Sequence, residues 1–283
     1  MARIITLLTD FGVQSTYPAQ MKGVILERCP EAVIVDMSHG VPSHNVHTAA
    51  FMLASAAPAF PEGTVHVVVV DPQVGSDRRV LAVEAEGHFY VAPDNGVLTL
   101  VAQGRSLATL RSSASLRSTS RGEGRPPARM VSVENRRFSR TEVSSTFQGR
   151  DVFAPAAAAI ASGVALKEFG PPVDSIVPFD LPLPEQEGDT ILGQVLYVDP
   201  FGNLVTNVAA EMLAGAEPGA VQVTVAGAVI RGLSRAYCDV PAGSLLAYIG
   251  SAGLLEVAVN RQSAAVRLGA DIGTPLRITR SKP

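Results

Sequence analysis

The stretch HVVVVDPQVGSDRR, residues 66–79, decides the fold class of this chain. A mostly β-branched apolar run, Val65–Val70, stops at Asp71, and a short loop with a proline and a glycine follows. A strand this apolar is typical of a parallel sheet that is covered on both faces. Ligands of such sheets bind beyond the carboxyl ends of the strands. Asp71 is therefore expected at a ligand-binding edge with Arg78 nearby, although a loop-opening aspartate paired with a surface arginine explains the segment equally well.

Strand and helix patterns alternate on both sides of this stretch. Strand-like runs lie between helical patterns, and an Ala-rich helix with a proline in its first turn comes later. This alternation predicts an α/β fold with a doubly wound, mainly parallel sheet. The expected elements are strands at 3–8, 32–36, 65–70, 80–84 and 88–92, and helices at 19–28, 46–56 and 151–162.

The pattern changes beyond a proline-rich boundary at residues 170–189. Short alternating segments then replace the helices, which predicts a C-terminal antiparallel β-barrel domain. We therefore expect an α/β domain over 1–180, to which the family resemblance described below assigns nucleoside binding and catalysis, and a barrel domain over 190–283. Residues 104–140 contain nine arginines and two acidic residues and are expected to form a solvated, mobile loop, with a contact to nucleic acid as the less favoured interpretation.

Composition excludes several classes of function. The chain has 283 residues, 47% hydrophobic and 17% charged, and a net charge of −3, which favours neither nucleic acid nor an anionic membrane as partner. No apolar run reaches the roughly 18 residues of a membrane span. The start of the chain lacks a signal-peptide pattern, so a cytoplasmic location is expected. Standard cofactor motifs are missing, and His44 and His47 lack a nearby carboxylate, so neither cofactor nor metal is predicted.

Two turns carry residues that suit a nucleoside. Asp10 follows the first strand, where a carboxylate can accept hydrogen bonds from both ribose hydroxyls, although it can equally cap the next helix. The segment Asp199-Pro200-Phe201-Gly202-Asn203 is a turn by composition. Phe201 and Asn203 also offer an aromatic face and an amide to a base, but from composition alone the plain turn is favoured.

Seven segments together resemble the S-adenosylmethionine hydrolase family, also called SAM hydroxide adenosyltransferases, which is related to the fluorinase and chlorinase enzymes. They follow the family order over nearly the whole chain, apart from the Arg-rich segment. The matching segments are TDFG at 9–12, MKGVI at 21–25, VDPQVGSDRR at 70–79, APDNG at 92–96, TFQGRDVFAPAA at 146–157, VDPFGNLVTN at 198–207 and SAGLLEVAVN at 251–260.

The resemblance implies hydrolysis of S-adenosyl-L-methionine to adenosine and L-methionine by attack of water or hydroxide at the 5′ carbon. It also implies a homotrimer with sites between subunits, built from an α/β domain and a β-barrel. Asp71 and Arg78 match two members of the family's trio of Asp, Arg and His. The implied substrate contacts are Asp10 to the ribose, Phe201 and Tyr237 around the adenine, Asn203 to its edge, and Ser251 to the methionine end.

The chain departs from the family pattern at two of these positions. Gln148 stands where the family motif F-H-G-R-D has its histidine, and an amide cannot accept a proton near neutral pH. Ser15 stands where many members have an aspartate that faces the methionine. A weakened hydrolase, a non-catalytic protein that binds S-adenosylmethionine or adenosine, and an adenosyltransferase with another nucleophile such as halide therefore remain open. Asp71 would repel a halide, so hydrolysis ranks above halogenation.

Overall fold

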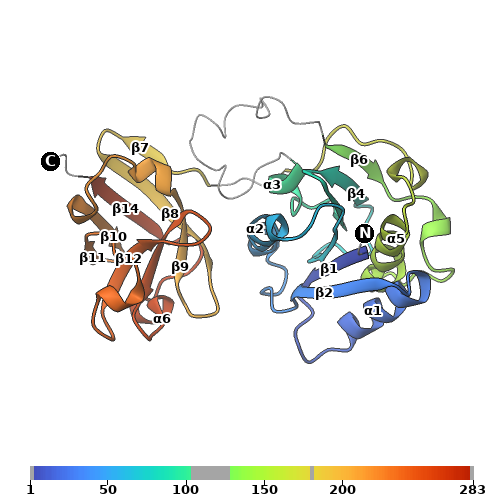
Figure 1. Ribbon diagram of the computed structural model, residues 1–283, viewed down its shortest axis with the longest axis horizontal. Helices are drawn as coiled ribbons and strands as arrows, with labels where there is room; N and C mark the ends of the chain where they lie inside the picture. Colours follow the sequence, from blue (N-terminus) through green and yellow to red (C-terminus); the bar gives the residue numbers. More distant parts are fainter. Residues whose placement is uncertain (1–2, 103–127, 179–181, 281–283) are drawn as a thin grey trace. The chain divides into compact units, whose positions relative to one another are not determined.

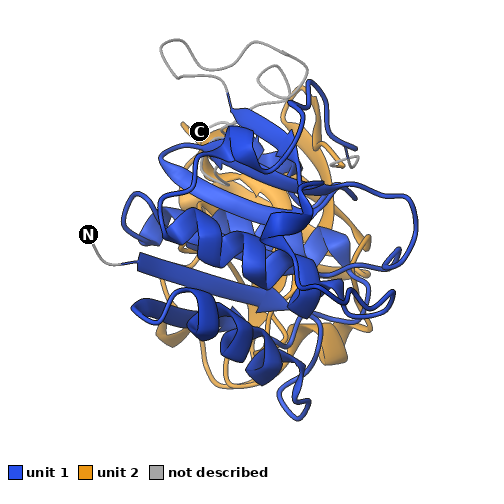
Figure 2. Cartoon of the chain, turned by 90° about the vertical axis from the view of Figure 1, so that its right-hand side faces the viewer, with its two compact units in different colours: residues 1–106, 120–179 blue, residues 107–119, 180–283 orange. Residues whose placement is uncertain are grey.

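The computed structural model describes residues 3–102, 128–178 and 182–280 of the chain. These residues form two compact units, which Figure 2 distinguishes by colour. Unit 1 comprises residues 3–102 and 128–178, and unit 2 comprises residues 182–280. Each unit is a separate fold (Figure 1).

Unit 1 is built on a six-stranded sheet in the order β2-β1-β3-β5-β4-β6. The first four strands in this order are parallel, and β4 and β6 are antiparallel to their neighbours. The predicted mainly parallel α/β sheet is therefore confirmed. The strands are β1 (Arg3–Thr9), β2 (Ala32–Ser38), β3 (Val65–Val69), β4 (Val80–Ala85), β5 (His88–Pro93) and β6 (Arg129–Ser132).

Helices cover both faces of this sheet. The helices are α1 (Tyr17–Arg28), α2 (Val46–Ala56), α3 (Thr99–Ala102) and α5 (Ala154–Ala161). Figure 1 shows α1 and α5 on one face and α2 and α3 on the other. All five residues of β3 are buried, as expected for a strand that is covered on both sides.

Two parts of unit 1 differ from the sequence-based expectations. The end of the segment 104–140 is not a solvated loop, because β6 pairs with β4 and both Val131 and Phe138 are buried. Residues 103–127 lie outside the described residues. The helix expected over 151–162 begins earlier, as a π-helix at Gly149–Phe153 that continues into α5. Such π-helical turns occur frequently at functional sites.

Unit 2 is an antiparallel sheet that nearly closes into a barrel, as predicted. Its strands follow the order β11-β10-β14-β8-β9-β13-β12, with β7 paired to β8. An isolated bridge between Ser234 and Tyr248 connects the two ends of this order. The elements are β7 (Glu185–Glu187), β8 (Thr190–Val198), β9 (Leu204–Ala209), β10 (Val221–Val225), β11 (Ala228–Arg231), β12 (Leu245–Ile249), β13 (Leu254–Val259), α6 (Ala264–Leu268) and β14 (Pro275–Arg280).

A row of polar side chains lies buried on the α2 face of the unit 1 sheet. His66 of β3 is fully buried, with its Nδ1 2.8 Å from Thr6 Oγ1 and its Nε2 3.3 Å from His88 Nδ1. Its ring stacks on Tyr90, with 5.2 Å between the centroids. Burial lowers the pKa of His66 from 6.5 to about 3, and the neighbouring His88 adds to this shift.

We expect this histidine to make unit 1 sensitive to acid. In the unfolded chain His66 is protonated below about pH 6.5, whereas in the folded chain it stays neutral down to about pH 3. Acidification therefore favours the unfolded state. We expect the free energy of unfolding to fall by about 1.4 kcal/mol per pH unit below pH ~6 from this group. Denaturant titrations at pH 7 and pH 5 measure the loss. His66→Gln should flatten the dependence, and a slope equal to that of the parent protein would contradict the assignment.

Candidate functional site

Acidic side chains gather where the parallel strands of unit 1 end. Asp10 follows β1, Asp71 follows β3 after one residue, and Asp94 follows β5. Because these strands are parallel neighbours, their carboxyl ends share one edge of the sheet. Ligands of open α/β sheets bind at this edge. Asp71 therefore lies at the carboxyl edge of the parallel sheet, as the sequence predicts.

Asp71, Arg78 and Gln148 form one polar cluster, in which the side chains of Asp71 and Arg78 are buried and Gln148 is half-buried. Arg78 Nε lies 2.9 Å from both carboxylate oxygens of Asp71, and Arg78 Nη2 also donates to Asp71 Oδ2. The same Nη2 donates to Gln148 Oε1 at 2.5 Å. The side chains of Asp71 and Arg78 are each only 4% exposed. The structure thus brings together the three side chains that the sequence analysis singled out, although Gln148 is 70 residues from Arg78 along the chain.

The direction of the Gln148 amide follows from its partner. A guanidinium has five N–H donors and no acceptor, so only the amide oxygen can face it. The Gln148 Nε2 group therefore points away from Arg78. Among the described residues, Nε2 has no hydrogen-bond partner, so its two N–H groups can donate to a bound water or anion.

Two glycines let the loops of this cluster approach each other. Gly75 has a φ of +83°, and a Cβ there would lie 2.6 Å from Ser145 O, so the loop after β3 packs directly against the segment that leads to Gln148. A Cβ on Gly149 would lie 3.3 Å from both Met21 Sδ and Val69 Cγ1. A side chain at either position would separate Gln148 from β3 and its loop.

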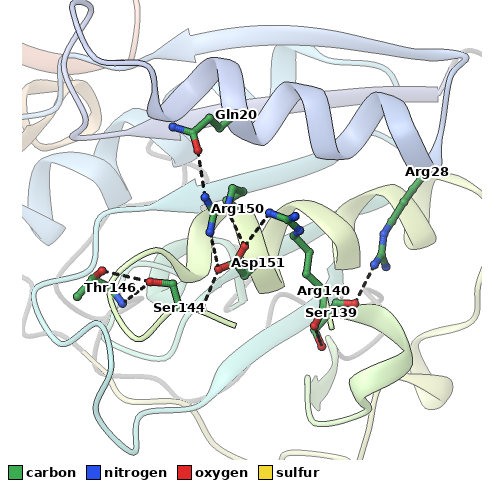
Figure 3. Close-up of polar contacts among 8 residues, drawn as sticks. All are labelled: Gln20, Arg28, Ser139, Arg140, Ser144, Thr146, Arg150 and Asp151. Atoms are coloured by element: carbon green, nitrogen blue, oxygen red, sulfur yellow. Dashed lines mark hydrogen bonds and ion pairs between the residues drawn. The ribbon is translucent and has the colours of Figure 1, made fainter. Parts of the chain in front are cut away.

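A buried carboxylate organises the segment that carries Gln148 (Figure 3). Asp151 is fully buried and accepts hydrogen bonds from Arg150 Nε at 2.7 Å and from Ser144 N at 2.8 Å. Arg140 Nη1 lies 3.5 Å from its Oδ1, and Arg150 Nη1 reaches Gln20 Oε1 of α1 at 3.1 Å. Burial works to raise the pKa of Asp151, but the bonds from Arg150 and Ser144 outweigh it and lower that pKa. Asp151 therefore holds the loop in place as an anion.

Asp10 lies in a short loop between β1 and α1 and is oriented by backbone. Its Oδ2 accepts a hydrogen bond from His44 N at 2.8 Å, and His44 has a φ of 65°, which is unusual for a residue other than glycine. Strain of this kind clusters at functional sites. The helix-cap interpretation that the sequence left open is wrong, because Thr16 and not Asp10 is the N-cap residue of α1.

Three aromatic rings join the Asp10 loop to the Gln148 segment. Phe11, Tyr17 and Phe147 have ring centroids 4.8–5.8 Å apart. The sequence analysis did not identify this cluster. The available signal was an aromatic residue next to each candidate site residue, Phe11 beside Asp10 and Phe147 beside Gln148.

Unit 2 contains a second polar network at the turn after β8. Asn203 Nδ2 donates to Asp199 Oδ2 at 2.7 Å and lies 2.9 Å from the Tyr237 hydroxyl oxygen. The Tyr237 and Tyr248 hydroxyls lie 2.6 Å apart, and Tyr248 donates to Glu256 Oε2. Asn203 and Tyr237 are therefore in one network. Asp199 and the Tyr237 hydroxyl accept hydrogen bonds from the side-chain Nδ2 of Asn203, so Oδ1 is the part of the amide left for a ligand.

The remaining predicted residues are more exposed. Phe201 is 79% exposed in the same turn as Asn203. Ser251 lies in the turn between β12 and β13 and is exposed, and no hydrogen bond joins it to the Asn203 network within residues 182–280. Ser15 lies before α1 and accepts a hydrogen bond from Tyr17 N at 3.3 Å.

Neither a metal site nor a membrane span is evident in the described parts of the chain. No group of three or more His, Cys, Asp and Glu residues there is arranged to hold a metal ion. Within the same residues, every helix is too short or too polar to cross a bilayer.

Comparison with known proteins identifies the family. The family model of the SAM hydroxide adenosyltransferase N-terminal domain matches residues 5–170, and that of the C-terminal domain matches residues 193–277. This chain belongs to the SAM hydroxide adenosyltransferase family. An (R)-S-adenosyl-L-methionine hydrolase from Thermus thermophilus is 40% identical to this family member over 286 aligned residues, which cover 98% of this chain and 99% of the relative.

Other relatives extend the comparison to structure and to a different reaction. An uncharacterized conserved protein from Thermotoga maritima has a crystal structure that matches with a TM-score of 0.85 at 34% identity, covering 98% of this chain and 100% of that one. A fluorinase from Actinoplanes sp. is 27% identical over 311 aligned residues, covering 98% of each chain. The hydrolase relative is therefore more similar to this chain than this fluorinase is.

Proposed function

We propose that the protein hydrolyses S-adenosyl-L-methionine to adenosine and L-methionine by attack of water or hydroxide at the 5′ carbon. The observation that carries this proposal is the buried Asp71–Arg78 pair at the carboxyl edge of the sheet, with Gln148 bound to the same guanidinium. Family membership and the (R)-S-adenosyl-L-methionine hydrolase relative support it. The name of that relative further favours the (R) sulfonium epimer as substrate.

The main requirement of this reaction is that the site orients and activates the attacking water. The leaving group is a neutral thioether expelled from a sulfonium, so no general acid is needed. Asp71 would accept a proton from the attacking water, Arg78 would hold Asp71, and Gln148 Nε2 would donate to the water oxygen and orient it. Sulfonium and hydroxide lose their charges as they react, which a water-poor site favours.

Substrate binding would use the remaining residues. Asp10 would accept hydrogen bonds from the ribose hydroxyls, and Phe201 and Tyr237 would flank the adenine. Asn203 Oδ1 would accept a hydrogen bond from the exocyclic amine of adenine, because the Nδ2 group of Asn203 already donates to Asp199 and Tyr237. Ser251 would contact the methionine end. No cofactor or metal takes part in this scheme, and a cytoplasmic location fits the substrate.

Product analysis tests the reaction. The protein is incubated with separated (R) and (S) epimers of S-adenosylmethionine, with and without fluoride or chloride, and the nucleoside and amino-acid products are identified. We expect adenosine and methionine from the (R) epimer, with or without halide. A 5′-halogenated nucleoside would identify a halide adenosyltransferase. Tight adenosine binding without turnover would identify a binding protein, the function that Gln148 favours as the alternative.

We also propose a homotrimer with each site shared between subunits. The proposed ribose and nucleophile residues lie in unit 1 and the adenine residues in unit 2, and a neighbouring subunit can supply one set. Light scattering after size-exclusion chromatography should give about three times the 29.6 kDa chain mass. A monomer that retains full affinity for adenosine would contradict this arrangement.

A further inference from the structure

The loop that carries Asp71 and Arg78 is fastened at both ends by one dipeptide. This loop, residues 71–78, leaves the sheet after β3 and returns at β4. Val70 precedes it and Arg79 follows it, and both are bound by the residues that follow β5, Asp94 and Asn95.

Asn95 holds the entry to the loop. Its Nδ2 donates to Val70 O at 2.9 Å, and its Oδ1 accepts from Val97 N at 3.2 Å. The pairing of β3 ends at Val69, and Val70 is fully buried. A buried carbonyl that the sheet no longer pairs needs another donor, and Asn95 supplies it.

Asp94 holds the exit. It is only 5% exposed, and its Oδ2 accepts from Arg79 Nε at 2.8 Å and from Arg79 Nη2 at 2.5 Å. Its backbone N donates to Arg79 O at 3.0 Å, so both the side chain and the backbone of Arg79 are bound. Asp94 Oδ1 accepts from Val177 N at 2.8 Å, which in turn fixes the carboxylate.

We propose that Asp94 and Asn95 are positioning residues for the Asp71–Arg78 pair. The pair depends on geometry, because Arg78 must meet both oxygens of Asp71 and Gln148 at once. A loop whose two ends are tied to consecutive residues keeps its first and last side chains at a set separation. Displacing reacting groups by about 1 Å can lower a rate by about 10²-fold. This inference rests on the proposed function, and its test separates the two.

Asn95→Asp is the sharpest test, because it preserves shape and the acceptor for Val97 N but places an oxygen against Val70 O. We expect kcat for S-adenosylmethionine to fall by about 10- to 100-fold with KM changed less than about twofold. Asn135→Asp is the matched control: Asn135 also accepts from a backbone N, Arg137 N at 3.1 Å, and donates to a backbone oxygen, Glu168 O at 2.8 Å. It should leave kcat unchanged.

A double-variant comparison distinguishes positioning from general support of the fold. If Asn95 acts through Asp71, Asn95→Asp should cost little further activity in an Asp71→Asn background. If the double variant loses the product of the two single-variant losses in kcat, the proposal is overturned. A wild-type kcat in Asn95→Asp alone would also overturn it. An Asp71→Asn variant with wild-type rate would instead overturn the proposed reaction site.

A second substitution covers the case in which Asn95→Asp does not fold. Arg79 is 41% exposed at its side chain and Asp94 keeps its hydrogen bond from Val177 N, so Arg79→Met and Arg79→Lys should both fold. We expect kcat to fall in Arg79→Met and to recover in part in Arg79→Lys, which keeps a charge for Asp94. Equal and unchanged kcat in both variants would show that Asp94 has no positioning role.

Discussion

The Asp71→Asn variant is expected to lose about 10²- to 10⁴-fold in the rate of S-adenosylmethionine hydrolysis, the range for loss of a general base. Of the three side chains in the Asp71–Arg78–Gln148 cluster, Asp71 is the one that can accept a proton, because Arg78 stays charged and Gln148 is an amide. Adenosine affinity should change little, because the proposed nucleoside contacts lie elsewhere. Single-turnover kinetics and calorimetric titration with adenosine measure the two effects.

Stability must be measured together with this rate. Arg78 is 4% exposed, and removing its partner leaves a buried charge, which typically costs about 3–5 kcal/mol. The double variant Asp71→Asn/Arg78→Gln removes both charges and should recover stability without recovering turnover. If either variant hydrolyses S-adenosylmethionine at the wild-type rate, Asp71 is not the proton acceptor.

The Gln148→His variant is expected to hydrolyse S-adenosylmethionine at least about tenfold faster than the parent, a part of the 10²- to 10⁴-fold typical of general base catalysis. An imidazole has a pKa near neutrality and exchanges a proton with the attacking water, whereas the amide only orients it. The surrounding segment needs no other change, since Asp151 and Gly149 already hold its backbone. The kcat of both proteins is compared from pH 5.5 to pH 9.

The pH profile identifies the cause of any gain. Gln148 has no ionisable group, so a limb near pH ~6.5 should be present only in the histidine variant. Gln148→Asn is the control for side-chain size, and it should bring neither the gain nor the limb. A histidine variant slower than the parent would show that the N–H donors of Gln148 have a positive role.

The sequence predicted the architecture well where local patterns carry the information. The apolar run at Val65–Val70 correctly indicated a strand covered on both faces, and the alternating segments after residue 190 indicated the barrel. The interpretation was wrong for 129–140, where a short edge strand pairs with β4 despite the surrounding arginines. Four residues are too few for a periodic pattern, and the pairing partner decides their structure.

In the candidate site, too, the sequence predicted contacts within one loop but not contacts between distant segments. Asp71 and Arg78 were predicted as neighbours because they open and close one short loop, and Gln148 was added only through the family resemblance. The buried Asp151, the aromatic cluster of Phe11, Tyr17 and Phe147, and the Asp94–Asn95 dipeptide were not identified. Each of these groups acts on residues that are distant in sequence or supports another side chain, so it has no local pattern of its own.

By itself, the sequence determined the fold class, the strand that ends at Asp71, and the family, because periodicity, turn residues and ordered motifs are written along the chain. Only the tertiary structure decided that Arg78 binds both Asp71 and Gln148, and that the N–H groups of Gln148 point away from Arg78. It also decided that Asp94 and Asn95 hold the two ends of the loop. Hydrogen-bond geometry depends on the separation and direction of donor and acceptor in space. Packing of the loops against β3 and β5 sets both.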